Sequence, residues 1–132
     1  LAFEKPARAS ASLPDQSAAF AVDGDPATQW ASGEDPKQWI EIDLQGQYSI
    51  TEIRLLVAQW PEGETTHLIL VRSADSEQFT TVHTFSGATK DNDWLIFTPE
   101  TPLSNVAFVR IQTNSSPSWI AWKEIEVLGE ME

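Results

Sequence analysis

The sequence lacks cysteine and has few basic residues. Its 132 residues include no cysteine, which excludes both a disulfide framework and a thiolate metal site. Lys and Arg number 8 against 20 Asp and Glu, so the formal net charge is −12. A field of this sign repels phosphate-rich polymers and anionic lipid surfaces, which argues against nucleic acid and membrane lipid as partners. Acidity also serves solubility alone, so it excludes partners without identifying one.

Long hydrophobic runs and known catalytic motifs are absent as well. No stretch approaches the ~20 apolar residues of a membrane-spanning helix, and no G-x-S-x-G, H-E-x-x-H or P-loop pattern occurs. Glu41 and Asp43 share one face of an expected strand at a separation of about 7 Å, which matches a glycosidase spacing numerically. Solvated acids on a strand face explain this pair better. The sequence therefore predicts a protein that is not an enzyme.

Apolar residues recur mainly with a period of two, in short runs separated by Pro, Gly, Asp, Asn and Ser. This pattern is typical of antiparallel strands with one buried face. No helical stripe interrupts the strands, so the chain is predicted to form one all-β sandwich or barrel of seven or eight strands. Turns are expected at Asp35-Pro36, Pro61-Glu62-Gly63 and Ser86-Gly87. The expected strands are Trp39–Leu44, Thr51–Val57, Thr66–Arg72, Phe79–Phe85, Trp94–Phe97, Val106–Thr113 and Trp122–Leu128.

Three segments, in order along the chain, resemble the discoidin or coagulation factor V/VIII C-type domains and the related family-32 carbohydrate-binding modules. They are Ala21–Ser32, then Gln38–Leu44 followed by the strand Ile50–Val57, and finally Trp119–Val127. Phe108–Ile111 adds a fourth mark, so the resemblance spans nearly the whole chain.

The resemblance implies a discoidin-like jelly-roll β-sandwich of about eight antiparallel strands, of the galactose-binding-domain-like type, with binding loops at one end. It also implies a single module over residues 1–132 that was excised from a larger extracellular or cell-surface protein. Such modules concentrate a partner protein on its target without chemistry of their own. As an isolated module the domain is expected to be monomeric.

The loop Asp23–Thr28 concentrates oxygen donors in a tight turn. Calcium accepts six to eight oxygens, including carbonyls and hydroxyls, so such a loop can bind it if a distant residue completes the shell. The resemblance places that donor at Glu124 and implies a structural calcium site formed by Asp23, Asp25, Thr28 and Glu124, with carbonyls near Ala21 and Lys123. The alternative is an Asp-Gly turn that hydrogen-bonds only its own backbone.

Two of the six tryptophans fall on expected loops, which makes them candidates for ligand binding. Trp60 lies in a strand-ending turn and Trp119 in the loop before the last strand. An exposed indole offers a flat apolar face to the C–H side of a sugar ring, while polar neighbours satisfy the hydroxyls. The predicted glycan-binding set is Trp60, Trp119, Gln59, Glu62, Asn92 and Ser118. A structural role for Trp60 and Trp119 remains an equal alternative.

The remaining aromatic and histidine residues are expected to be structural. Trp30 and Trp39 match packing positions of the resembled family, and Trp94 opens a strand and is expected to pack. His67 and His83 lie inside expected strands rather than in a pocket. Galactose-binding members of the resembled family use a His, an Arg and an Asn on these loops. No Arg stands at the end of the segment Ile50–Trp60, so the usual galactose-binding set is not expected here.

Three functional hypotheses follow. The leading one is a calcium-stabilised, lectin-like carbohydrate-binding module that targets a host protein to a glycan or polysaccharide. The second is a protein–protein or cell-adhesion module whose tryptophans anchor a protein partner. The third is a calcium-stabilised spacer, in which neighbouring loops would bury Trp60 and Trp119. Asn114-Ser115-Ser116 is a glycosylation acceptor if the chain passes through a eukaryotic secretory pathway.

Overall fold

The computed structural model describes residues 2–132, and within them it contains eight strands and one short 3-10 helix. The predicted fold class, all-β with about eight antiparallel strands, is confirmed. No helix in this part of the chain has the length and apolar character that crossing a membrane requires. The elements are β1 (Ala7–Ala9), η1 (Ala18–Ala21), β2 (Trp30–Ala31), β3 (Gln38–Val57), β4 (Gly63–Arg72), β5 (Thr80–Thr89), β6 (Trp94–Phe97), β7 (Leu103–Ser115) and β8 (Ala121–Met131).

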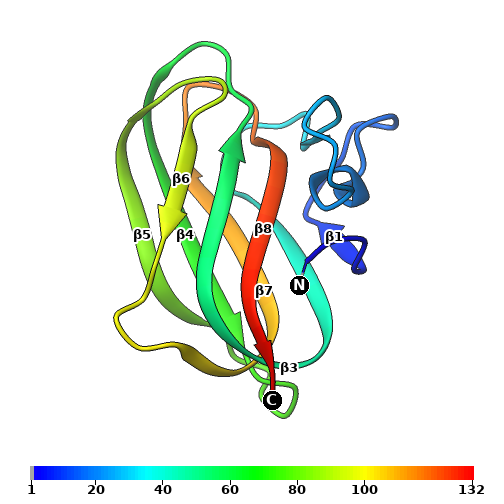
Figure 1. Ribbon diagram of the computed structural model, residues 1–132. Coiled ribbons are helices and arrows are strands. Elements are labelled where there is room, and N and C mark those ends of the chain that lie inside the picture. The colour runs from blue at the N-terminus through cyan, green and yellow to red at the C-terminus, as the bar shows by residue number, and fades with distance from the viewer. Residues whose placement is uncertain (1) are drawn as a thin grey trace.

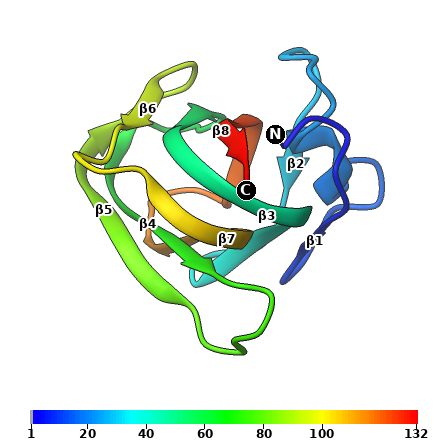
Figure 2. The ribbon, with the colours of Figure 1, turned by 60° about the horizontal axis from the view of Figure 1, so that its bottom comes forward.

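The 20-residue strand β3 belongs to both layers of the sandwich. Its first half pairs with β1 and β7, and its second half pairs with β8 and β6, all antiparallel. Register shifts between Asp43 and Ile50, and a positive φ of 59° at Gln45, mark the bend between the halves. The sheet, ordered β2-β8-β3-β7-β4-β5, thus folds over at β3 into two facing layers, a discoidin-like jelly roll (Figures 1 and 2).

The strands match the predicted ones with three differences. The two runs expected at 39–44 and 51–57 are joined in β3, because the chain bends without leaving the sheet. The expected turn at Ser86-Gly87 is wrong: both residues lie inside β5, where Gly87 pairs with Thr65. The short strands β1 and β2 were not predicted, since three and two residues cannot display a period.

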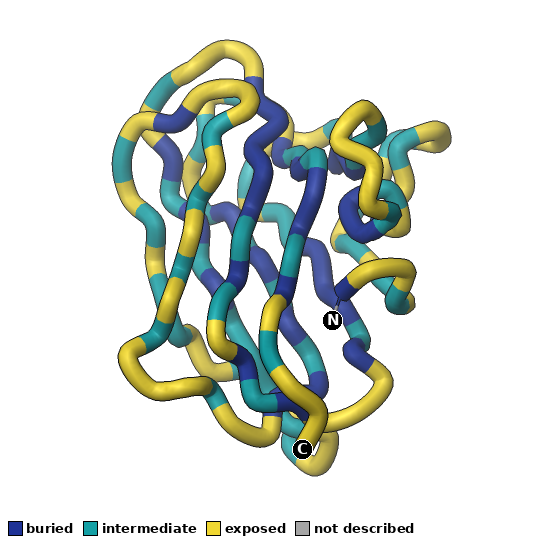
Figure 3. The backbone as a smooth tube through the Cα atoms, in the orientation of Figure 1, coloured by how far each residue is buried: buried dark blue, intermediate teal, exposed yellow. Residues whose placement is uncertain are grey.

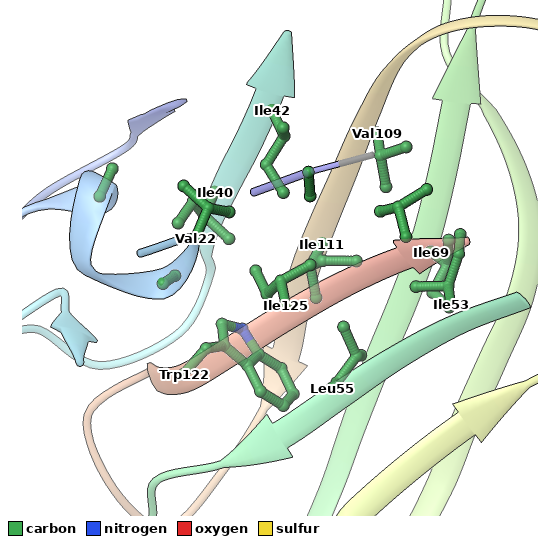
Figure 4. Packing of buried hydrophobic residues seen from close by; sticks show 14 of the residues in the cluster. Val22, Ile40, Ile42, Ile53, Leu55, Ile69, Val109, Ile111, Trp122 and Ile125 are labelled. Atoms are coloured by element: carbon green, nitrogen blue, oxygen red, sulfur yellow. The ribbon is translucent and has the colours of Figure 1, made fainter. Parts of the chain in front are cut away.

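The core lies between the two layers and is built from the inward residues of the alternating strands. Ile40, Ile42 and Leu44 are fully buried, as their alternation predicts. They pack with residues of β7 and β8, among them Ile111, Trp122 and Ile125, as Figure 4 shows. Exposed residues gather instead at the loops and along β5 and β6 (Figure 3). Burial at about 25 cal/mol per Å² of apolar surface makes this core the main source of stability.

The outer side of β3 corrects one expectation. Glu41 is not a solvated strand-face acid: it is 3% exposed and accepts hydrogen bonds from Arg8 Nε (2.7 Å) and Arg110 Nη2 (2.9 Å). Burial alone would raise the pKa of Glu41, but the hydrogen bonds and charges of both arginines outweigh it and hold that pKa below its ordinary value. A carboxylate with both oxygens committed to arginines is structural.

Candidate functional site

A pocket with a volume of about 330 Å³ opens at the end of the sandwich where β3 leads into β4 and where β8 begins, the upper end in Figure 1. Trp60 is 86% exposed and Trp119 53% exposed, and both line it. The spacer hypothesis, which requires both indoles to be buried, is therefore wrong. The other lining residues are Leu13, Gln16, Gln29, Ala31, Ala58, Gln59, Asp91, Ser118 and Ala121.

The pocket combines apolar faces with a few fixed polar groups. Gln29 Nε2 donates to Gln16 Oε1 over 3.1 Å, which orients two amides along one wall. Asp91 supplies a carboxylate whose Oδ2 lies 3.0 Å from Lys123 Nζ, so its charge is paired. Flat apolar surface beside oriented hydrogen-bonding groups is what a sugar ring requires. No arginine or histidine lines the pocket.

Gln59 shapes this pocket from within the protein. Its side chain is buried, and Nε2 donates to the carbonyls of Thr89 (3.1 Å) and Pro61 (3.2 Å), while Oε1 accepts from Thr89 Oγ1 (2.6 Å). Its backbone N–H donates to Asp91 Oδ1 over 3.0 Å. The amide is thus fully engaged, and Gln59 holds the Trp60 turn against the loop that carries Asp91.

The three other predicted polar residues divide between the pocket and its surroundings. Ser118 lines the pocket, and its hydroxyl donates to the Trp119 carbonyl over 2.9 Å. Asn92 does not line it: at φ 70° it accepts from Lys123 Nζ (2.6 Å) and so fixes the loop. Glu62 is exposed and also lies outside the lining set. Trp60, Trp119 and Ser118 are thus brought together at the surface of the pocket.

Sequence reasoning missed Gln16 and Gln29. They come from the irregular segment between β1 and β2, which carries no hydrophobic period to reveal its path. Asp91 belongs to a loop that the sequence did mark as a source of carboxylates, but nothing in the sequence distinguished it from its neighbours.

The remaining tryptophans and histidines are placed as predicted, with one exception. Trp30 is fully buried, and Trp39 is half-buried against the guanidinium of Arg110, 4.2 Å from its ring centroid. Trp94 is 46% exposed, so the packed role expected for it is wrong. In a four-residue strand the alternation defines two faces but not which one is buried, and Leu95 and Phe97 take the inner face.

Both histidines lie in strands, His67 in β4 and His83 in β5. Burial lowers the pKa of His67 to about 4. Its Nδ1 lies 2.6 Å from Thr113 Oγ1, and its Nε2 is buried without a hydrogen-bond partner among the described residues. The histidine is therefore neutral at physiological pH and belongs to the interior beneath the pocket.

The loop Asp23–Thr28 holds three of the four predicted metal-site residues, and the fourth, Glu124, lies against it; Asp25 Oδ1 accepts from the Ala27 N–H over 2.9 Å. Asp23 Oδ1 accepts from the Asp25 N–H (2.9 Å), and Thr28 Oγ1 donates to Asp23 Oδ2 (2.5 Å). Glu124, from β8, accepts from the Gly24 N–H over 3.3 Å. Gly24 adopts φ +76°, and a Cβ there would lie 2.6 Å from the Phe3 ring, so only glycine fits without displacement.

Glu124 is a buried carboxylate with a raised pKa. Burial is the largest cause, and together with the nearby charges of Asp23, Glu126 and Asp25, and against the hydrogen bond from the Gly24 N–H, it raises the pKa of Glu124 to about 7. Its Oε2 is buried with no hydrogen-bond partner in the described residues. An unsatisfied carboxylate oxygen facing acidic neighbours fits a divalent cation chemically. In the part of the chain that the structure describes, no three His, Cys, Asp or Glu side chains are placed so that they could hold a metal ion by themselves.

Comparisons with known proteins find similar domains. A chitosan-binding module of a Paenibacillus sp. IK-5 chitosanase/glucanase, solved with chitotriose, is 30% identical over 97% of this chain and 98% of that one, with a TM-score of 0.80. A family 89 glycoside hydrolase of Clostridium perfringens is 26% identical, with a TM-score of 0.78, and the match covers 98% of this chain and 14% of the hydrolase.

The family 32 module of Clostridium perfringens NanJ, solved with galactose, shares the fold at 17% identity, with a TM-score of 0.82 over 94% of this chain and 93% of that one. No protein of curated function matches the chain. The model of the F5/8 type C domain matches residues 6–126. The chain belongs to the F5/8 type C, or discoidin, domain family.

Proposed function

We propose that this domain is a non-catalytic carbohydrate-binding module whose ligand lies against Trp60 and Trp119. The observation that carries the proposal is the pocket itself: two exposed indoles, 86% and 53% exposed, border a concavity whose walls hold oriented amides and a hydroxyl. Two exposed indoles that border one concavity form the kind of apolar patch that marks a ligand-binding site, unlike a single exposed indole such as Trp94. Similarity to modules of chitosan-binding proteins supports the same conclusion.

Among glycans, we propose a glucosamine polymer as the ligand class. The net charge of −12 attracts protonated amines, and no arginine or histidine in the pocket opposes them. The 30% identity to a module solved with chitotriose supports this choice. The attraction acts through the field of the whole domain, because Asp91 is already paired with Lys123. Binding is therefore expected to weaken as salt rises.

We further propose a structural calcium ion at Asp23, Asp25, Thr28 and Glu124. The support is the partnerless Oε2 of Glu124 and the acidic surroundings that raise its pKa. A hard cation would satisfy this carboxylate together with loop carbonyl and hydroxyl oxygens. Its role would be to tie the loop between η1 and β2 to strand β8.

The module is proposed to act as part of a larger extracellular or cell-surface protein, which it brings to its glycan. The match within a much longer glycoside hydrolase, of which this chain covers 14%, supports this arrangement. In this role affinity can be modest, because immobilising the host protein on a polymer raises its effective concentration.

The test is a glycan array in calcium buffer with the parent domain, a Trp60→Ala/Trp119→Ala variant and a Trp94→Ala variant. Trp94 is the matched control because it is exposed but does not line the pocket. The proposal expects glucosamine-containing glycans to bind the parent and the control and to be lost in the double variant. If another class of glycan behaves in this way, the glucosamine assignment is wrong. Silence of the parent across the array would contradict glycan binding and favour a protein partner.

A further inference from the structure

A second cleft, with a volume of about 270 Å³, lies on the outer face of the layer formed by β1, β3, β7 and β4. Its lining residues are Pro6, Ala7, Arg8, Glu41, Asp43, Arg72 and Phe108, of which Ala7 also packs against the core. None of these residues lines the pocket of Trp60. Nothing in the glycan site described above accounts for this cleft.

The floor beside this cleft is a stack of alternating arginines and aromatic rings. The Arg110 guanidinium lies 4.2 Å from the Trp39 ring centroid and 4.4 Å from that of Phe79. The Arg72 guanidinium lies 3.7 Å from the centroid of Phe108. Stacking of this kind fixes a guanidinium in place and leaves its N–H edge free to point outward.

Arg72 differs from the other arginines in its partners. Arg8, Arg54 and Arg110 each form an ion pair with a glutamate, whereas Arg72 has no acidic partner among the described residues. Its Nη1 donates to the carbonyls of Ser73 (3.2 Å) and Ser76 (2.7 Å), which holds the group in position. The edge formed by Nε and Nη2 has no partner among these residues. In a chain with 20 acidic residues, an oriented arginine with an open edge is a site prepared for an external anion.

The cleft carries more positive than negative charge. Both oxygens of Glu41 are committed to Arg8 and Arg110, so three arginines face two carboxylates across this surface. The second carboxylate, Asp43, accepts the Gln45 N–H at Oδ1 over 2.9 Å, and its Oδ2 has no partner among the described residues. A ligand in the cleft therefore meets an anion-binding guanidinium on one side of Phe108 and a hydroxyl-binding carboxylate on the other.

We propose that this cleft binds a sugar acid, with the sugar carboxylate on the Nε/Nη2 edge of Arg72, a ring hydroxyl donating to Asp43 and the C–H face against Pro6. The pairing of Arg and Asp selects a ligand that carries both a carboxylate and hydroxyls, which a simple anion or a neutral sugar lacks. Arg8, whose side chain is 69% exposed, adds a second cation at the rim. The site is independent of the glycan pocket and of its ligand.

The test titrates methyl glucuronide and methyl galacturonide into the whole domain and follows the Nε–H resonance of Arg72 by NMR. Methyl glucoside, methyl galactoside and acetate are the matched probes. The proposal expects at least one uronide to shift this resonance saturably and to bind at least tenfold more tightly than its neutral counterpart and than acetate. Arg72→Gln should reduce that affinity at least tenfold. Lys37→Gln, which removes the same charge at an exposed residue, should leave it within twofold.

Two further variants keep the outcome decisive. Arg72→Lys retains the charge but not the fork, and its affinity is expected to fall at least fivefold. Trp60→Ala/Trp119→Ala should leave uronide binding unchanged, which separates this site from the glycan pocket. Equal affinity for acetate and uronide, an unshifted Arg72 resonance, or full retention of binding in a folded Arg72→Gln domain would each overturn the proposal.

Discussion

The loop end around Trp60 and the sheet face around Glu41 are both polar surfaces, but they are held in opposite ways. At the sheet face, Glu41 is 3% exposed and bonded to two arginines that stack on aromatic rings. At the loop end, Trp60 is 86% exposed and only the residues behind it, such as Gln59, are bonded to one another. The ion pairs of Glu41 are therefore expected to carry stability, and the exposed indoles of the loop end are expected to carry affinity for the glycan.

Of the two surfaces, the sheet face should show the larger stability change. Glu41→Gln leaves Arg8 and Arg110 without their shared carboxylate, so we expect a loss of about 2 to 3 kcal/mol in the free energy of unfolding. Glu62→Gln at the loop end, where the side chain is exposed, should change it by less than about 0.5 kcal/mol. Urea denaturation at pH 7 measures both. Equal effects from the two variants would remove the distinction between the surfaces.

The interior beneath the pocket predicts a pH dependence of stability. Because burial lowers the folded-state pKa of His67 to about 4, the unfolded chain binds its proton more readily than the folded one. The His67 contribution to stability is therefore constant above pH 6.5 and is lost as the pH falls from 6.5 towards 4, by up to about 3 kcal/mol. Glu124, whose folded-state pKa is raised to about 7, contributes in the opposite direction over the same interval, so the His67 loss is the difference between the parent and a His67→Phe domain. Denaturation at pH 7 and pH 4.5 would measure this loss.

A control for the pH effect is the NMR titration of the two imidazoles. The His67 resonances should titrate near pH 4. A normal titration of His67 near pH 6.5 would contradict the buried, neutral state. A His67→Phe domain should lose less stability than the parent over the same pH interval.

Calcium should stabilise the side of the sandwich where the Asp23 loop meets β8. A ligand that binds only the folded state at a hundred times its Kd adds about 2.7 kcal/mol, which corresponds to roughly 5–10 °C in Tm for a domain of this size. Melting in calcium and in chelator measures the difference. Glu124→Gln should abolish the calcium effect. Glu126→Gln, a substitution two residues further along β8, should preserve most of it. A melt that does not respond to calcium would contradict the proposed ion.

The strands were predictable because their alternation is local. Thr66–Arg72 and Trp94–Phe97 each show it in their own residues, and both form strands. The burial of Glu41 was not predictable, because its arginine partners lie 33 and 69 residues away in the sequence. Alternation assigned Glu41 to the outer face correctly but could not say that arginines cover it.

The residues of the pocket also include some that the sequence predicts and some that it does not. Trp60 and Trp119 were predicted because turn residues surround them and turns project from a sandwich. Gln16 and Gln29 reach the pocket through an irregular segment whose course depends on contacts such as the bond from the Ala31 N–H to the Gln16 carbonyl, 3.2 Å. The exposure of Trp94 depends on which face of β6 meets the core, and four residues do not decide that.

The central claim is that the Trp60 pocket is the glycan site, and calorimetric titration of a glucosamine trimer into single variants tests it most directly. The account predicts that Trp60→Ala and Trp119→Ala each weaken binding by about thirtyfold, or about 2 kcal/mol, with Tm unchanged. Trp94→Ala, on the outer face of β6, should bind like the parent. Loss of affinity in Trp94→Ala with full binding in Trp60→Ala and Trp119→Ala would contradict the account.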